Sequence, residues 1–264
     1  MKDDRRPIAV MDSGVGGISV LREMVRLMPQ EDFIFFGDSA NAPYGTKTTE
    51  FVRDLTVEHV NTFLDRGVKA VAIACNTATA AALKDLRKLY PNLPMVGIEP
   101  ALKPAVEQHP GGRILVMATP MTIREEKFNL LLSRFQEKAI IYPLACPGLM
   151  DYVEAGMFDS PKLYKFLEEL LWDYRNGEVD AVVLGCTHYP FVKRAISKVL
   201  GPEVEIFDGA EGTARELKRR IETAGVARKD VTHVGEVTFE NSNPTAKKLA
   251  LCQKLLELDL DKRA

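Results

Sequence analysis

Two cysteines stand in equivalent settings and could carry acid–base chemistry together. Cys75 follows the apolar run at 70–74, and Cys186 follows a similar run at 181–185. Each is followed by small hydroxyl or amide residues and then by a helical pattern. One thiol could remove a proton from one face of a carbon while the other donates a proton to the opposite face. The pair therefore suggests inversion of a stereocentre.

Each thiol needs help to ionise at neutral pH, because a free thiol has a pKa of about 8.5. We expect helix N-termini directly after both cysteines, and these would supply positive potential. Asp12 and His188 are the candidates for proton handling nearby. Glu154 is a candidate partner of His188.

The elements that must position these residues alternate along the chain. Apolar runs of strand length are followed by segments with apolar residues at helical spacing, which predicts parallel sheets covered on both faces. We expect strands at 8–12, 33–38, 70–75, 95–100, 113–120, 139–146, 181–186 and 204–210, and helices at 18–28, 50–66, 77–90 and 160–174.

The pattern restarts halfway along the chain. Residues 113–120 resemble residues 7–14, and the second cysteine strand follows the first by about 110 residues. Such a repeat predicts two α/β domains related by a pseudo-twofold. The pattern alone leaves open which domain takes the segment after Ala210, where we expect a helix, a short strand near 231–239 and a last helix.

Ligands of open parallel sheets bind beyond the carboxyl ends of the strands. If the two halves face each other, Cys75 and Cys186 meet across one cleft. Neutral hydrogen-bonding groups at helix starts suit carboxylates, and Asp12 suits an α-ammonium. We therefore expect an amino-acid pocket without a metal or cofactor. The residues at these strand ends are Asp12, Ser13, Tyr44, Gly45, Asn76, Thr77, Thr119, Thr187, His188 and the segment 146–154.

Composition excludes several classes of function. The net charge of −2 argues against nucleic-acid or membrane-surface binding as the main role. The GVGG at 14–17 lacks the G-x-G-x-x-G spacing, and no Walker lysine motif is present, so a dinucleotide is not expected. We find neither a signal sequence nor a membrane span. The four cysteines lack C-x-x-C spacing, so we expect reduced thiols in a cytoplasmic protein.

Several motifs, in order, resemble those of the bacterial glutamate racemases, within the aspartate/glutamate racemase superfamily. They are DSGVGG (12–17), PYG (43–45), ACNTATA (74–80), PALKPA (100–105), the Thr119-x-x-Thr122 pair and LGCTHYP (184–190). The resemblance covers roughly residues 7–225. It implies cofactor-independent interconversion of L- and D-glutamate, with D-glutamate supplied for peptidoglycan and cell-wall biogenesis.

The resemblance also implies roles for individual residues. Cys75 is the base for the D-enantiomer, assisted by Asp12. Cys186 is the base for the L-enantiomer, assisted by His188 and Glu154. The positions that match substrate-contacting residues of the family are Asp12, Ser13, Tyr44, Gly45, Asn76, Thr77, Thr119, Thr122, Thr187 and His188.

The same resemblance implies that the C-terminal segment returns to the first domain. The domains are then 1–99 plus 210–264, and 100–209, with the active site in the cleft between them. A homodimer is expected, and a cell-wall precursor that activates some members is a further candidate partner.

Two departures from the family pattern stand out. The loop reads NAPYG, where many members have a cysteine before the proline, and ENSNPTA (240–246) replaces a Gly-Asp-Pro found in many members.

Other activities remain as alternatives. An aspartate racemase of the same superfamily is the nearest, although His188 stands where aspartate enzymes tend to carry glutamate. A cysteine amidohydrolase would use only one thiol with His188. A two-lobed amino-acid binding protein would need no opposed thiols.

Overall fold

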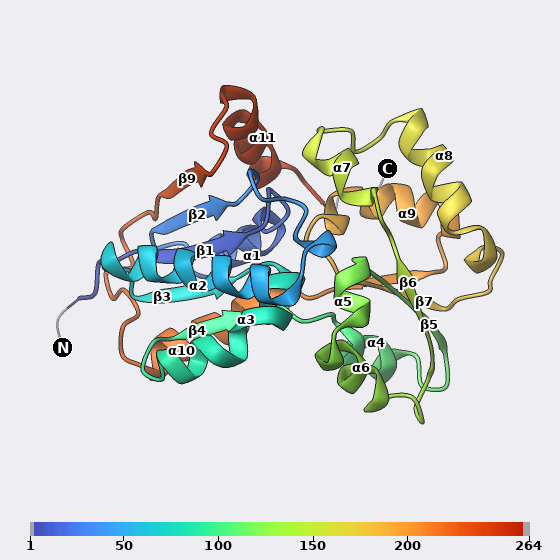
Figure 1. Cartoon of the computed structure of the whole chain (residues 1–264), viewed down its shortest axis with the longest axis horizontal. Coiled ribbons are helices and arrows are strands. Elements are labelled where there is room, and N and C mark those ends of the chain that lie inside the picture. The colour runs from blue at the N-terminus through green and yellow to red at the C-terminus, as the bar shows by residue number, and fades with distance from the viewer. Residues whose placement is uncertain (1–2, 261–264) are drawn as a thin grey trace.

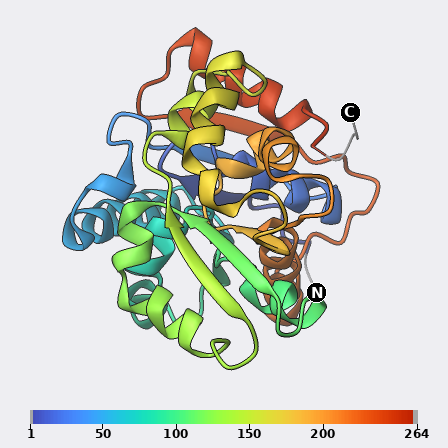
Figure 2. The same cartoon turned by 90° about the vertical axis from the view of Figure 1, so that its right-hand side faces the viewer.

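Two parallel β-sheets flanked by helices make up the protein. The structure, a computed structural model, describes residues 3–260. In Figure 1 the blue and cyan strands of the first sheet lie on the left and the second sheet lies on the right. In Figure 2 the second sheet, with its green strands, lies in front of the first. This confirms the fold class expected from the sequence.

The first sheet has five strands in the order β4-β3-β1-β2-β9, all parallel. They are β1 (Ile8–Asp12), β2 (Phe33–Gly37), β3 (Ala70–Ile73), β4 (Met95–Gly97) and β9 (Val237–Asn241). Alternate residues of β1 point to opposite faces, and each face has its own apolar cluster. One face packs against α1 (Ile18–Leu27), α10 (Ala210–Thr223) and α11 (Ala246–Glu257), and the other against α2 (Thr49–Asp65) and α3 (Asn76–Leu89).

The second sheet has four parallel strands in the order β6-β5-β7-β8. They are β5 (Arg113–Ala118), β6 (Ile140–Ala145), β7 (Ala181–Leu184) and β8 (Glu205–Asp208). Its helices are α4 (Leu102–Gln108), α5 (Pro120–Arg124), α6 (Glu126–Ser133), α7 (Leu149–Glu154), α8 (Pro161–Leu170) and α9 (Lys193–Leu200). Short 3-10 helices occur at Tyr44–Thr46, Trp172–Tyr174 and Tyr189–Val192. Read from β8 to β6, the strand order matches β4-β3-β1-β2 of the first sheet, which is consistent with the internal repeat.

The C-terminal strand differs from the expectation. We expected it near 231–239, and β9 runs from Val237 to Asn241 beside β2. The segment before it is held by side chains together with isolated backbone bonds, among them Gly235 N–H to Pro29 O at 2.8 Å. Arg228 donates to Asp32 Oδ2 at 2.7 Å, and His233 Nε2 lies 2.8 Å from Asp32 Oδ1.

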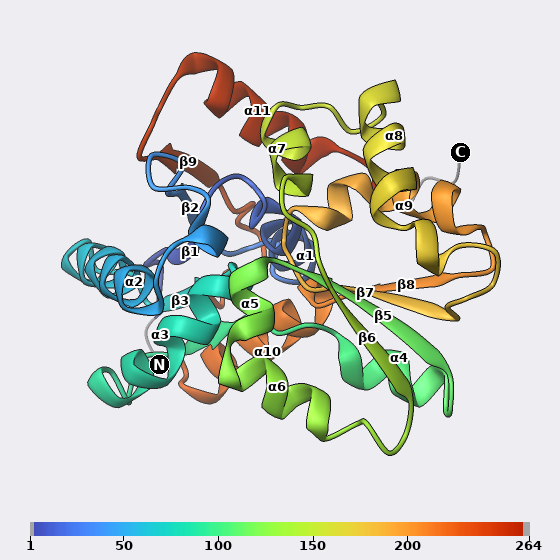
Figure 3. The same cartoon turned by 45° about the vertical axis from the view of Figure 1, so that its right-hand side comes forward.

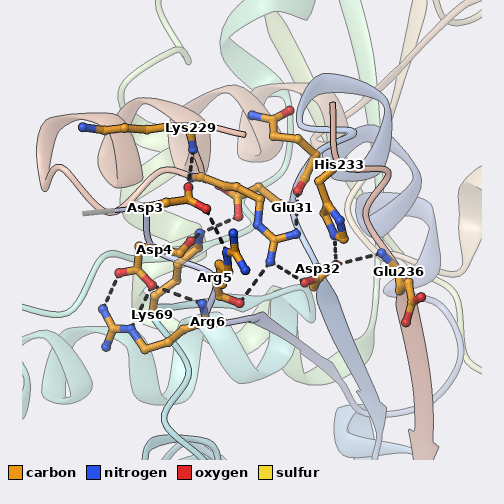
Figure 4. A network of polar contacts seen from close by, with 12 residues as sticks. Asp3, Asp4, Arg5, Arg6, Glu31, Asp32, Lys69, Lys229, His233 and Glu236 are labelled. Atoms are coloured by element: carbon orange, nitrogen blue, oxygen red, sulfur yellow. Dashed lines mark hydrogen bonds and ion pairs between the residues drawn. The ribbon is translucent and has the colours of Figure 1, made fainter. Parts of the chain in front are cut away.

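These contacts belong to a polar network at the N-terminal ends of β1, β2 and β3 (Figure 4). At its centre Lys69 and Glu31 form an ion pair at 2.5 Å, and neither side chain is exposed. The network fixes residues 3–6 and 228–236 at the end of the sheet away from the cysteines.

The last helix joins the two halves of the molecule. Cys252 and Leu255 of α11 belong to the same apolar cluster as Leu149 and Val153 of α7. Figure 3 shows α11, in red, beside α7. The boundaries that we expected between two domains, after 99 and after 209, stay predictions.

No helix within residues 3–260 is long and apolar enough to cross a membrane.

Candidate functional site

The predicted residues gather where the carboxyl ends of the two sheets meet. Asp12 ends β1, Cys75 follows β3 and Cys186 follows β7. A hydrogen bond joins the strand ends of the two sheets, because Thr187, the neighbour of Cys186, bonds Asp12 at 3.1 Å. Within each sheet, parallel pairing places the carboxyl ends of all strands at one edge, and the residues that follow the strands lie there.

Cys75 is a buried thiol at the N-terminus of α3. Its Sγ donates to Ser13 Oγ at 3.5 Å. Burial, followed by the negative charge of Asp12, raises the pKa of Cys75 to about 12. The helix start that we expected after Cys75 is present, but its effect is outweighed by burial.

The segment after Cys186 differs from the one after Cys75. A 3-10 turn, Tyr189–Val192, comes first, and α9 begins only at Lys193. Pro190 explains this delay. In an α-helix that began directly after Cys186, the N–H of residue 190 would bond the Cys186 carbonyl, and proline has no N–H. The expected α-helix N-terminus directly after Cys186 is therefore absent.

A side-chain relay serves Cys186 instead. His188 Nδ1 lies 3.7 Å from Cys186 Sγ, and His188 Nε2 lies 2.9 Å from Glu154 Oε1. Burial lowers the pKa of His188, but its hydrogen bonds to Cys186 and Glu154 outweigh this and raise it well above the usual value. Burial alone would raise the pKa of Glu154, but the bonds from His188, Lys248 and the Val15 N–H together lower it to about 2. The geometry thus favours an imidazolium that donates to both neighbours.

Two glycines of the DSGVGG motif leave room for this relay. A Cβ on Gly14 would overlap Glu154 Oε1, and a Cβ on Gly16 would overlap the His188 ring. The backbone of this loop also contributes a donor, since the Val15 N–H bonds to Glu154 Oε1 at 2.8 Å. The sequence motif therefore reflects close approach between the loop after β1 and the second half of the molecule.

Asp12 connects the same loop to the second cysteine motif. The Gly14 N–H donates to Asp12 Oδ2 at 3.1 Å, and the Thr187 hydroxyl donates to Asp12 Oδ1 at 3.1 Å. Burial raises the pKa of Asp12 despite the nearby positive charge of His188. Asp12 therefore presents a buried carboxyl beside Cys75.

Three predicted threonines form one cluster of hydroxyls. Thr77 Oγ1 lies 3.2 Å from Thr119 Oγ1 and 3.3 Å from Thr122 Oγ1, and the last two are 2.9 Å apart. Gly45 packs against Thr119, and a Cβ there would lie 2.8 Å from the Thr119 Cβ. The cluster joins the start of α3 to the start of α5.

Asn76 stands beside this cluster with an open amide. Its residue is 5% exposed, and neither Oδ1 nor Nδ2 has a hydrogen-bond partner among the described residues. A buried amide without partners is costly, so it marks a place where a polar ligand could bond.

Tyr44 is positioned by residues that the sequence reasoning missed. Its hydroxyl donates to Asp38 Oδ2 at 2.6 Å, and His59 Nε2 lies 3.1 Å from the same oxygen. Asp38 follows β2 at the carboxyl edge of the sheet, which is the signal that could have revealed it. Lys248, which contacts Glu154 from α11, was missed as well, and no motif signals it.

The arrangement can move protons at two distinct thiols. One thiol sits beside a hydroxyl and a carboxyl, and the other sits beside an imidazole paired with a carboxylate. Within residues 3–260, no group of three His, Cys, Asp or Glu side chains is placed to hold a metal ion.

Comparisons with known proteins point to one family. The family model described as Asp/Glu/Hydantoin racemase matches residues 8–217. A glutamate racemase of Clostridium botulinum is 46% identical over 257 residues, covering 97% of this chain and 99% of that protein.

Solved structures agree with this. The glutamate racemase of Thermus thermophilus in complex with β-chloro-D-alanine has a TM-score of 0.80 at 35% identity, covering 96% of this chain and 94% of that one. The Escherichia coli glutamate racemase, in complex with L-glutamate and the activator UDP-MurNAc-ala, has a TM-score of 0.81 at 28% identity over 95% of each chain.

Proposed function

The chain belongs to the Asp/Glu/hydantoin racemase family, and we propose that it interconverts L- and D-glutamate without a cofactor, using Cys75 and Cys186 as the two bases. The observation that carries the proposal is the pair of buried thiols with unlike proton partners at one edge of two sheets. A substrate between them would meet a thiol on each face. We place it in a cleft between the two halves.

The unlike partners suggest the resting state. Burial and Asp12 keep Cys75 protonated, because its pKa is raised to about 12. The imidazolium of His188 faces Cys186, and a cation there stabilises a thiolate. Cys75 would then rest as a thiol, and Cys186 would exchange its proton with the relay of His188 and Glu154.

With the L-enantiomer, Cys186 is the base. Its thiolate takes the α-proton, and Cys75 gives its proton to the opposite face of the α-carbon. The product is D-glutamate, with Cys75 now a thiolate and Cys186 a thiol. The reverse reaction starts from that second state, so each thiol acts as acid in one direction and as base in the other.

Polar groups around the thiols would orient glutamate. The carboxyl of Asp12 suits the α-ammonium, and that pairing would also neutralise the charge that helps to keep Cys75 protonated. The open amide of Asn76 and the hydroxyls of Thr77, Thr119 and Thr122 suit the carboxylates. The remaining predicted contacts are Ser13, Tyr44, Gly45, Thr187 and His188.

The wider role follows from the family. We propose that the D-glutamate is used for peptidoglycan, that the enzyme works in the cytoplasm and that it forms a homodimer. The Escherichia coli relative binds the activator UDP-MurNAc-ala, which supports testing that compound on this chain.

The test follows L-glutamate in D2O by circular dichroism and by α-deuterium uptake, with and without UDP-MurNAc-ala. We expect racemisation together with exchange, and no comparable exchange with L-aspartate. Exchange with aspartate alone would reverse the substrate assignment.

Single substitutions test the roles of the thiols. Cys75→Ser and Cys186→Ser should each abolish racemisation, while one-way elimination from a glutamate analogue survives through the remaining thiol. Full turnover in Cys75→Ser together with its loss in Cys186→Ser would support an amidohydrolase-like use of one thiol.

A further inference from the structure

Lys248 reaches the relay at Cys186 from the C-terminal helix, although no catalytic motif contains it. Its Nζ forms an ion pair with Glu154 Oε2. We propose that Lys248 is a positioning residue that holds the Glu154 carboxylate against His188 and so controls proton transfer at Cys186 only. The proposal rests on the two-thiol function given above.

The two oxygens of Glu154 have different partners. Oε1 accepts from the Val15 N–H at 2.8 Å and from His188 Nε2 at 2.9 Å. Oε2 is taken by Lys248. A carboxylate held at both oxygens cannot rotate about its last torsion without losing a charged hydrogen bond. Lys248 therefore fixes the orientation in which Oε1 meets the imidazole.

Burial makes this contact stronger than a surface ion pair. The side chains of Lys248 and Glu154 are only 19% and 15% exposed. Ion pairs shielded from water in this way are screened less by salt than exposed ones. Removing the ammonium would leave a largely buried carboxylate with one unpaired oxygen.

The scaffold places Lys248 firmly. Thr245 caps α11 by accepting the Lys248 N–H at 3.2 Å. One turn further on, the fully buried Cys252 packs in the same apolar cluster as Val153, the neighbour of Glu154. The contact thus joins α11, which lies on the first sheet, to α7, which lies on the second.

The relay makes direct contact with Cys186 and not with Cys75. Cys75 Sγ donates to Ser13 Oγ, and the carboxyl of Asp12 accepts from the Gly14 N–H and the Thr187 hydroxyl. Loss of Lys248 should therefore slow the step in which Cys186 gives or takes a proton and leave the Cys75 step intact. A general loss of structure would slow both steps alike.

Primary isotope effects separate these cases. We would compare Lys248→Met with Lys248→Arg, and use Lys247→Met, an exposed lysine on the same helix, as the matched control. Each protein is assayed in both directions with L-[2-²H]glutamate and D-[2-²H]glutamate. Thermal unfolding checks that each variant is folded.

For Lys248→Met we expect kcat to fall about 10-fold, the effect of losing one hydrogen bond to a charged group. The isotope effect should rise with deuterated L-glutamate, because its proton is removed by the slowed Cys186 step. With deuterated D-glutamate it should fall, because the slowed step then follows the isotopically sensitive one. Lys248→Arg should restore most of kcat, and Lys247→Met should stay within about twofold of wild type.

Unchanged isotope effects in both directions would overturn the role of Lys248, whatever happens to kcat. If Lys248→Met does not fold, Lys248→Gln is measured in the same way. Failure of the function itself looks different, because the wild-type protein would then exchange no α-hydrogen of glutamate at all.

Discussion

Gly16→Ala tests whether the position of the His188 ring controls catalysis. The added Cβ would lie 2.3 Å from His188 Nδ1 and 2.6 Å from Cγ, where ordinary contacts begin at 3.4 Å. The ring must therefore move by about 1.1 Å, the difference between 3.4 and 2.3 Å. Gly16 is not among the described glycines with a positive φ, so the effect comes from the collision and not from backbone strain.

The His188 ring is held on both sides, so it cannot shift this far without losing a contact. His188 bonds Glu154 at 2.9 Å on one side and meets Cys186 at 3.7 Å on the other. Moving the ring by this much breaks one of these contacts. Misplacement of a catalytic group by about 1 Å can cost about 100-fold in rate. We expect kcat to fall about 100-fold, and stability to fall by about 1–3 kcal/mol from overpacking.

The assay measures glutamate racemisation by circular dichroism and stability by urea unfolding. Gly212→Ala is the matched control, because nothing lies within 4 Å of its Cβ on α10. It should keep full activity and gain about 0.5–1 kcal/mol of stability, as expected for alanine replacing glycine in a helix. A folded Gly16→Ala enzyme with activity within about threefold of wild type would refute the reasoning, since a displacement of this size should cost far more.

Three further predictions follow from buried charges. Lys69→Met should destabilise the protein by about 3 kcal/mol or more in urea unfolding, because it leaves the Glu31 carboxylate buried without its ion partner, and a smaller loss would contradict this. Asp38 is fully buried, and hydrogen bonds from His59 and Tyr44 overcome burial and lower its pKa to about 2. Its stabilising contribution of about 2 kcal/mol is present above pH 4 and is lost as pH falls toward 2, so Asp38→Asn should flatten that part of the stability curve. At pH 7, iodoacetamide should modify Cys75 only slowly in the folded protein, because burial and Asp12 raise the pKa of its thiol to about 12, and rapid modification of Cys75 in peptide mass spectrometry would contradict this.

Local patterns predicted the fold well, because parallel strands buried on both faces leave a strong signal. The repeat is reflected in the strand order that the two sheets share. The start of β9 was misplaced because the 226–236 segment is held by Arg228 and His233, and such long-range side-chain contacts leave no periodic pattern.

The sequence singled out residues that the structure brings together, but it did not reveal their environments. The structure brings Cys75 beside Ser13 and Cys186 beside His188, in line with the motif order. Burial determines the pKa of Cys75, and burial depends on how the two halves pack together. Lys248 could not be found, because its partner is 94 residues away and an ordinary helix carries it.

The fate of the α-hydrogen tests the central claim most directly. L-Glutamate is converted in D2O to low extent, and deuterium is then measured separately in the remaining L-glutamate and in the D-glutamate formed. With two bases, the D-glutamate receives its hydrogen from the solvent-exchanged thiol of Cys75, so the account predicts a deuterated product and an almost unlabelled substrate. Equal deuterium in both enantiomers at early times, or a product that retains the substrate hydrogen, would mean that one group serves both faces and would contradict the account.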